Sequence, residues 1–200
     1  MAHTQLLCCL VIITLVTIAT AAPVEWPVAQ GGNGHFYEAV VAPDGISWHD
    51  AKAAAESAGG YLATITSQEE NNFVFNLINY DIFWRSVPAN LPAWSASFVG
   101  PWIGGFQPEG SSEPGGDWQW VTGEPFSYAN WDLMQPDNYP IYGDQDYLHF
   151  GWQPLRASKW DDTWDNQPPF VPISYVIEIP EPVTLSLLGL GSLGLIRKRK

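Results

Sequence analysis

The sequence predicts an α+β domain with two helices, small antiparallel sheets, one long loop and no disulfide bonds. Apolar residues recur at helical spacing between residues 47 and 78, which is the pattern of helices with one buried face. Between residues 101 and 179, short segments instead alternate apolar and polar residues, as half-buried strands do. The loop is the aperiodic stretch 126–145, whose aromatic residues argue against disorder.

The first half of the domain begins with a predicted strand and a predicted helix. Residues 35–41, HFYEAVV, alternate in polarity and are followed by the turn sequence APDG. The helix is expected to begin at Ser47, because Asp50 stands three residues later as in a capping box. The glycine pair at 59–60 is expected to end it. Residues 61–65, YLATI, form a second short predicted strand.

A second helix is predicted to begin at Ser67, which forms a full capping box with Glu70. Its buried face is expected to comprise Phe73, Val74, Leu77 and Ile78. The second half of the domain contains a flexible loop at 109–116 and five predicted strands, at 101–106, 117–121, 146–150, 158–164 and 174–179. Four tryptophans are expected in the core rather than on a binding surface: Trp102, Trp118, Trp120 and Trp131.

The N-terminal segment, residues 1–22, is predicted to be a secretory signal peptide. Residues 6–17 form an apolar run, and small residues follow it up to an expected cleavage position near Ala21 and Ala22. The two cysteines of the chain, Cys8 and Cys9, lie in this segment, so the mature protein is expected to contain no disulfide bond. We therefore expect the protein to be exported to the cell surface or the extracellular space.

The C-terminal segment, residues 180–200, begins with Pro-Glu-Pro, continues with an apolar stretch at 183–196 and ends in the basic sequence RKRK. The apolar stretch spans about 21 Å as a helix, which is short for a membrane span. This order of features resembles the bacterial PEP-CTERM sorting tail. The resemblance implies transient membrane association and processing by an exosortase; the alternative is a permanent anchor. The sequence GLGSLG at 189–194 is no nucleotide-binding motif, because no strand precedes it.

The part of the chain between these two segments is strongly acidic. All 21 Asp and Glu residues lie between residues 25 and 181, against four basic residues there, which gives this part a net charge of −17. A nucleic-acid partner is excluded by the sign of this charge, because phosphate binding requires basic residues. Such acidity suits divalent cations or solubility.

The order of motifs across residues 35–179 resembles the C-type lectin-like domain. The motifs are GGYLATITSQEENNFV, WIGG, DWQWVTGEPFSYANW, QPDN, DYLHF, KWDD and YVIEI. Members of that family usually contain two disulfide bonds, whereas Ala55, Tyr147 and Ile177 stand here where three of those cysteines would be. The resemblance therefore implies the lectin-like fold, with aromatic and aliphatic packing in place of the crosslinks.

The resemblance also implies a calcium ion held by side-chain oxygens on either side of a cis proline at 136. The implied metal ligands are Gln135, Asp137, Asp161 and Asp162, with Asp144 or Gln145 as a further one. A monosaccharide could complete the coordination of the ion, and the implied carbohydrate contacts are Gln135, Asp137, Tyr139 and Asp161. The order Gln-Pro-Asp resembles that of galactose-binding members, and Tyr139 would stack on the sugar.

Three functions remain open at this point. The leading one is an exported, calcium-dependent module that binds a glycan or exopolysaccharide. The second is an adhesion or extracellular matrix protein in which the loop contacts another protein and calcium only makes it rigid. An enzyme is disfavoured, because His35, His49 and His149 match no catalytic motif and neither H-E-x-x-H nor G-x-S-x-G is present.

Overall fold

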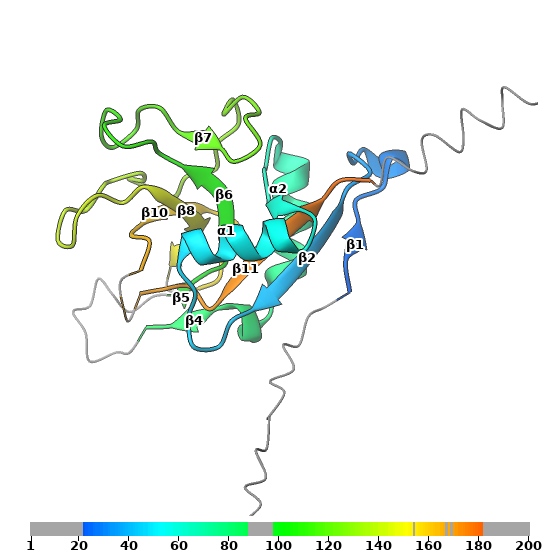
Figure 1. Ribbon diagram of the computed structural model, residues 1–200, viewed down its shortest axis with the longest axis horizontal. Helices are drawn as coiled ribbons and strands as arrows, with labels where there is room; N and C mark the ends of the chain where they lie inside the picture. The colour runs from blue at the N-terminus through cyan, green and yellow to red at the C-terminus, as the bar shows by residue number, and fades with distance from the viewer. Residues whose placement is uncertain (1–21, 88–97, 154, 167, 169, 182–200) are drawn as a thin grey trace, which may run out of the picture.

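The computed structural model describes residues 22–87, 98–153, 155–166, 168 and 170–181. Within these residues, two α-helices pack on the two faces of a mixed sheet, and a smaller sheet lies beside it (Figure 1). The predicted α+β class is confirmed. In the part of the chain that is described, no helix has both the length and the apolar character that crossing a membrane requires. The predicted signal peptide and most of the predicted sorting tail lie outside the described residues.

The helices are α1 (Trp48–Ser57) and α2 (Gln68–Ile78), with single 3-10 turns η1 (Val28–Gln30) and η2 (Asp81–Phe83). The larger sheet has the order β1-β2-β11-β6-β8-β10, with β3 paired to β11 and β7 paired to β6. Its strands are β1 (Val24–Glu25), β2 (Phe36–Val41), β3 (Tyr61–Leu62), β6 (Trp102–Phe106), β7 (Gln119–Trp120), β8 (Tyr147–Phe150), β10 (Trp160–Thr163) and β11 (Ser174–Ile179). The smaller sheet, in the order β4-β5-β9, comprises β4 (Arg85–Ser86), β5 (Phe98–Val99) and β9 (Trp152–Gln153).

Both helices begin where their capping residues predict. The Ser47 hydroxyl accepts a hydrogen bond from the Asp50 backbone N–H at 3.0 Å, and Gly59 in the left-handed conformation follows the end of α1. The Ser67 hydroxyl accepts from the Glu70 N–H at 3.1 Å. The expected reciprocal bond from Glu70 to Ser67 is replaced, because the Glu70 carboxylate accepts instead from the Thr66 N–H at 2.7 Å.

Most predicted strands are shorter in the structure than in the sequence analysis, and for two of them the local reason is visible. The strand expected at 61–65 ends at Leu62, because the Thr64 N–H donates to the Glu178 carboxylate at 2.9 Å rather than to a strand. The strand expected at 117–121 comprises only Gln119 and Trp120, since Asp117 has a φ of +58°. By contrast, β11 has the predicted bounds.

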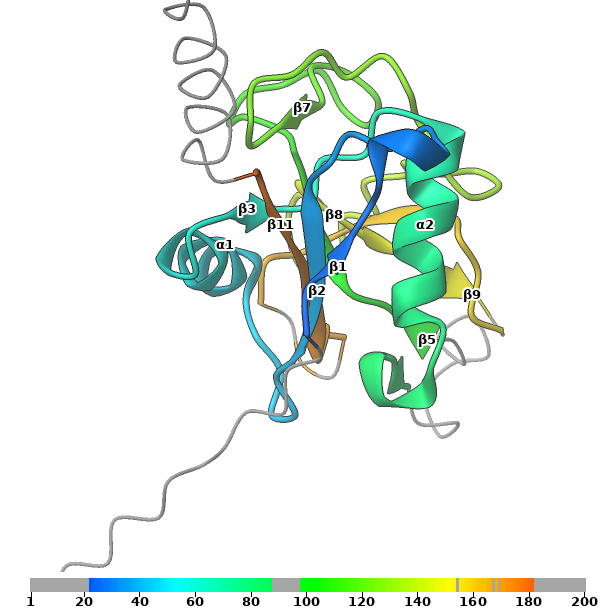
Figure 2. The same ribbon diagram turned by 90° about the vertical axis from the view of Figure 1, so that its right-hand side faces the viewer.

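The two faces of the sheet bury different clusters. Alternate residues of β2 and β11 contact α1 on one face and α2 on the other, as Figure 2 shows. Of the tryptophans expected in the core, Trp102, Trp118 and Trp120 are buried, and Trp131 packs partly buried against the α2-side cluster.

Apolar packing occupies the positions where related domains would have cysteines. Ala55 and Ile177 are buried together in the α1-side cluster, and Tyr147 packs against that cluster with its ring 4.9 Å from that of Trp48. This part of the core is therefore held together by aromatic and aliphatic packing, as was expected from the absence of cysteines at these positions.

The buried Trp160 of β10 generates a prediction about stability. Its indole N–H donates to the side-chain oxygen of Asn71 in α2 at 2.7 Å, and neither residue is accessible to solvent. Trp160→Phe should lower the free energy of unfolding by about 2–3 kcal/mol, because a buried oxygen loses its donor and the core loses volume. Urea unfolding would measure the change. The exposed Leu155→Ala control should change it by less than about 0.5 kcal/mol, and an equal loss in both variants would contradict the assignment.

Candidate functional site

The long loop lies along the free edge of β10. The Trp160 N–H donates to the Asn130 carbonyl at 3.0 Å, and the Asp132 N–H donates to the Trp160 carbonyl at 2.9 Å. Trp131 forms a parallel bridge with Trp160, and their rings meet edge to face. These contacts hold the start of the loop, at residues 130–132, next to β10, the strand that contains Asp161 and Asp162.

The Asp162 carboxylate joins the loop to the sheet. One of its oxygens accepts from the Asp137 N–H at 3.0 Å, and the other accepts from the Asn138 N–H at 2.8 Å. The preceding bond, Gln135–Pro136, is cis as expected, and Asn138 has a φ of +43°. Asp162 is buried, and burial raises its pKa to about 7 although the two backbone donors lower it.

Asp161 precedes Asp162 in β10 and is also buried. It pairs across the ladder with His149, whose Nε2 lies 3.9 Å from an Asp161 oxygen. Burial, and next the charge of Asp162, holds the pKa of Asp161 well above its ordinary range. His149 does not offset that charge, because burial lowers the pKa of His149 to about 4 and keeps the imidazole neutral.

Two uncompensated features distinguish this region. The side-chain oxygen of Gln135 is buried and has no hydrogen-bond donor among the described residues. The charges of Asp162 and Asp137 add to burial in raising the pKa of Asp161, and that of Asp137 adds to burial in raising the pKa of Asp162. No salt bridge to Lys or Arg joins any of the three in the described part of the chain. Hard oxygen donors with excess negative charge are the chemistry that calcium requires. The residues present therefore fit a calcium ion, although the described residues contain no ready group of three His, Cys, Asp or Glu side chains at metal-binding spacing.

The two alternative ligands, Asp144 and Gln145, have other partners. The buried Gln145 accepts from the Tyr139 N–H through its side-chain oxygen, and its own N–H donates to the Asn138 side chain at 2.7 Å. Asp144 is exposed and receives a long hydrogen bond of 3.4 Å from the Asn138 amide. Both residues thus support the backbone of the loop, and Asn138, which the sequence analysis did not single out, connects them.

A second acidic group near the loop was also missed from the sequence. Burial raises the pKa of Glu113, and the charges of Asp146 and Asp144 raise it further. The buried side-chain oxygen of Gln107 has no donor among the described residues, and the Gln107 N–H donates to the Asp146 carbonyl at 2.8 Å. The close spacing of Asp144 and Asp146 was the available signal, but residues 107 and 113 come from a separate loop that only folding brings near.

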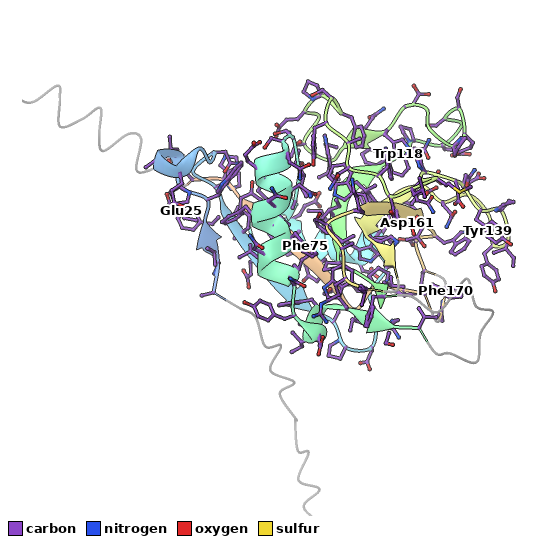
Figure 3. The ribbon with its side chains drawn as sticks, turned by 180° about the vertical axis from the view of Figure 1, so that it is seen from behind. Glu25, Phe75, Trp118, Tyr139, Asp161 and Phe170 are labelled. Atoms are coloured by element: carbon purple, nitrogen blue, oxygen red, sulfur yellow. The ribbon has the colours of Figure 1, made fainter. Side chains whose placement is uncertain are left out.

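Like Asp137, which is exposed, the predicted carbohydrate contact Tyr139 is accessible to solvent. Its side chain is 44% exposed, and Figure 3 shows it at the outer end of the loop, with Asp161 farther in. The arrangement therefore has two buried carboxylates, Asp161 and Asp162, an exposed one, Asp137, and an aromatic ring at the outer end of the loop.

Comparisons with known proteins show which family and fold the chain resembles. The model of the lectin C-type domain family matches residues 44–168, and the PEP-CTERM protein-sorting motif matches residues 178–200. A perlucin-like protein of Mytilus galloprovincialis is 32% identical over 145 residues, which are 70% of this chain and 76% of that protein. C-type lectin domain family 4 member F of Rattus norvegicus is 34% identical over 52% of this chain, which spans only 16% of that longer protein.

Solved structures share the fold at low sequence identity. Herring type II antifreeze protein superposes with a TM-score of 0.54 at 23% identity, covering 76% of this chain and 94% of its own. The cow CD23 carbohydrate-recognition domain, solved in the presence of a GlcNAc2Man3 oligosaccharide, has a TM-score of 0.50 at 20% identity, covering 74% and 89%. The family and its relatives are binding proteins, so the chain is not an enzyme.

The buried carboxylates generate a prediction about pH. With a chelator present, the free energy of unfolding should fall as the pH rises from 3.8 to about 7. The lower value is the pKa of Asp162 in the unfolded chain, and the higher value is its pKa in the folded protein. The folded protein binds the proton of the Asp162 carboxyl group more tightly than the unfolded chain does. The stabilisation that this proton provides is therefore fully present below pH 3.8 and is lost as the pH rises to about 7. The loss is roughly 4 kcal/mol at most.

Urea unfolding at several pH values would measure this dependence. Asp162→Asn should flatten the profile, whereas Asp81→Asn, which changes a carboxylate in an exposed ion pair, should leave the slope unchanged. A metal-free protein that becomes more stable over this pH interval would contradict the assignment.

Proposed function

The chain belongs to the family of lectin C-type domains, and we propose that it is an exported module that binds carbohydrate through a calcium ion. The single observation that carries the proposal is the Asp162 bridge. It holds the Gln135–Asp137 segment against β10, where Asp161 and Asp162 supply further oxygens. Two chain segments, 25 residues apart at this contact, thereby contribute to one acidic site.

Calcium would be held by Gln135, Asp137, Asp161 and Asp162. The unpaired oxygen of Gln135 gains a partner in this way, and the mutual repulsion of the carboxylates is relieved. Asp162 can bind an ion while it accepts from two backbone N–H groups, because a carboxylate has about four lone-pair positions. When bound, the ion would supply open coordination positions for two neighbouring sugar hydroxyls. Asp144 and Gln145 then act through the loop backbone instead of contacting the metal.

A galactose-type ligand is the finer part of the proposal. The order of amide and carboxylate at 135 and 137 supports it, since Gln135 can donate a hydrogen bond where Asp137 can only accept. Tyr139, at the outer margin, would stack on the apolar face of the sugar. The second candidate is adhesion to another protein, which the exposed apolar side chains Leu133 and Met134 of the same loop favour.

Titration calorimetry tests the proposal. Calcium should bind with a dissociation constant of about 0.1–1 mM, the range of extracellular modules, and methyl β-galactoside should bind only after calcium is present. Asp137→Asn should weaken both steps, because it removes a charged ligand. Asp165→Asn is the matched control, since that carboxylate pairs with His49 away from the loop. Calcium binding without any response to galactosides or mannosides would favour the adhesion candidate, and an absence of calcium binding would remove the metal.

Export and processing complete the proposal. The PEP-CTERM motif implies export and surface sorting. We propose that residues 1–22 are removed as a signal peptide and that an exosortase removes the apolar segment of the tail. The intact mass of the protein from its native host should therefore lack both segments, whereas a mass that retains Arg197 to Lys200 would indicate a permanent anchor.

A further inference from the structure

The loop that holds the proposed ligands also exposes large apolar side chains on both sides of them. Two of these precede Gln135 and are 86% and 83% exposed, and three follow Asp137 and are between 44% and 50% exposed. We name this set the apolar rim; it consists of Leu133, Met134, Tyr139, Ile141 and Tyr142. Single exposed apolar residues need no explanation, but a group of them around a site points to a partner.

The apolar rim is not a general property of the surface. The other large apolar side chains that are exposed in the described residues lie near the N-terminus, at Val24 and Val28, or on another part of the surface, at Tyr80, Ile82 and Leu155. The loop at 109–116, which is comparably exposed, has no large apolar residue. Half of the exposed large apolar side chains thus come from ten consecutive residues of one loop.

Local backbone and ring contacts position the rim. The Leu133 N–H donates to the Asp132 side chain at 2.7 Å, and Met134 has a φ of +71°. On the other side of the site, the Ile141 N–H donates to the Tyr139 carbonyl at 3.0 Å. The ring of Tyr142 meets that of Trp164 edge to face at 5.2 Å. The rim is therefore part of a structured loop.

The place of the apolar rim next to the proposed ligands, together with the charge of the domain, indicates the chemical class of its partner. Met134 is bonded directly to Gln135, and Tyr139 is two residues from Asp137, so rim residues are neighbours of the proposed ligands along the chain. The net charge of −17 disfavours an anionic partner such as a uronic-acid polymer or an acidic lipid surface. The ligand that fits is neutral and has hydroxyls next to an apolar group.

We propose that the site selects neutral glycosides that carry an apolar substituent, such as an alkyl, acyl or aryl group, and that the apolar rim contacts this substituent. The inference rests on the proposed carbohydrate function and narrows its ligand class. The hydroxyls meet the oxygen donors, while the substituent covers Leu133 and Met134.

Calorimetry on the full mature protein, with calcium, compares methyl β-galactoside with hexyl β-galactoside. The hexyl compound should bind about tenfold more tightly, the gain expected from burying roughly two methylene groups. In the double variant Leu133→Asn with Met134→Asn, the ratio of the two affinities should fall to within about twofold. Asparagine tolerates the left-handed conformation at position 134, so the fold should persist, and an unchanged melting temperature would check this. Ile82→Asn, an exposed residue of η2, is the control and should keep the tenfold ratio.

Each other result overturns the inference in a recognisable way. Equal affinities for the two galactosides would remove the role of the rim and leave the carbohydrate function intact. A hexyl preference that survives in the double variant would assign the contact to other residues. Binding of neither galactoside would overturn both proposals. If the double variant instead abolishes self-association, or binding to neutral phosphatidylcholine vesicles, without a change in the affinity ratio, the rim is covered by a second copy or by lipid.

Discussion

The hydrogen bonds that Asp162 accepts from two consecutive backbone N–H groups hold the long loop against the sheet. Asp162 lies in a strand of four residues, and the loop that it holds contains about twenty residues without regular structure. Gln135, Asp137 and Tyr139 depend on this contact for their place beside β10. A buried charge is costly unless it is hydrogen-bonded or paired, and here two N–H groups meet only part of that need. The remaining charge is what would attract the proposed calcium ion.

A comparable carboxylate network stabilises the other end of the sheet without needing an ion. Glu178 of β11 accepts from His35 at 2.7 Å and from the Thr64 N–H, and Glu70 of α2 accepts from the Tyr37 hydroxyl and from Thr66. These bonds connect the N-terminal segment to the segment between β3 and α2. The two buried glutamates therefore have a donor on every oxygen.

The features that could be predicted from the sequence are those that depend on neighbours in the chain. The starts of α1 and α2 follow from Ser47 and Ser67, because capping is decided within three residues. The four strands β1, β4, β5 and β9 were not predicted, since each has two residues and forms only through pairing with a distant partner.

The limits of prediction at the site have the same origin. Resemblance to the family motif identified the oxygen-bearing residues, but their hydrogen bonds depend on folding. No spacing rule indicates that the Gln145 oxygen binds the Tyr139 backbone, or that His149 lies across from Asp161 without neutralising it. The glutamate network was missed for this reason too, because Glu70 and Glu178 are more than a hundred residues apart.

The pairing of β2 with β11 has a consequence for how the domain is displayed. Phe36, at the start of β2, lies opposite Ile179, at the end of β11, so the chain enters β2 and leaves β11 at the same end of the sheet. Figure 3 shows Glu25 on one side of the molecule and Tyr139 on the opposite side. Because Glu25 pairs with Phe36, the C-terminal end of β11 lies on the side of Glu25, so an attachment through that end would leave the loop on the side away from the support. The loop that contains Tyr139 is thus on the far side of the domain from the C-terminal end of β11, where a partner in solution can reach it.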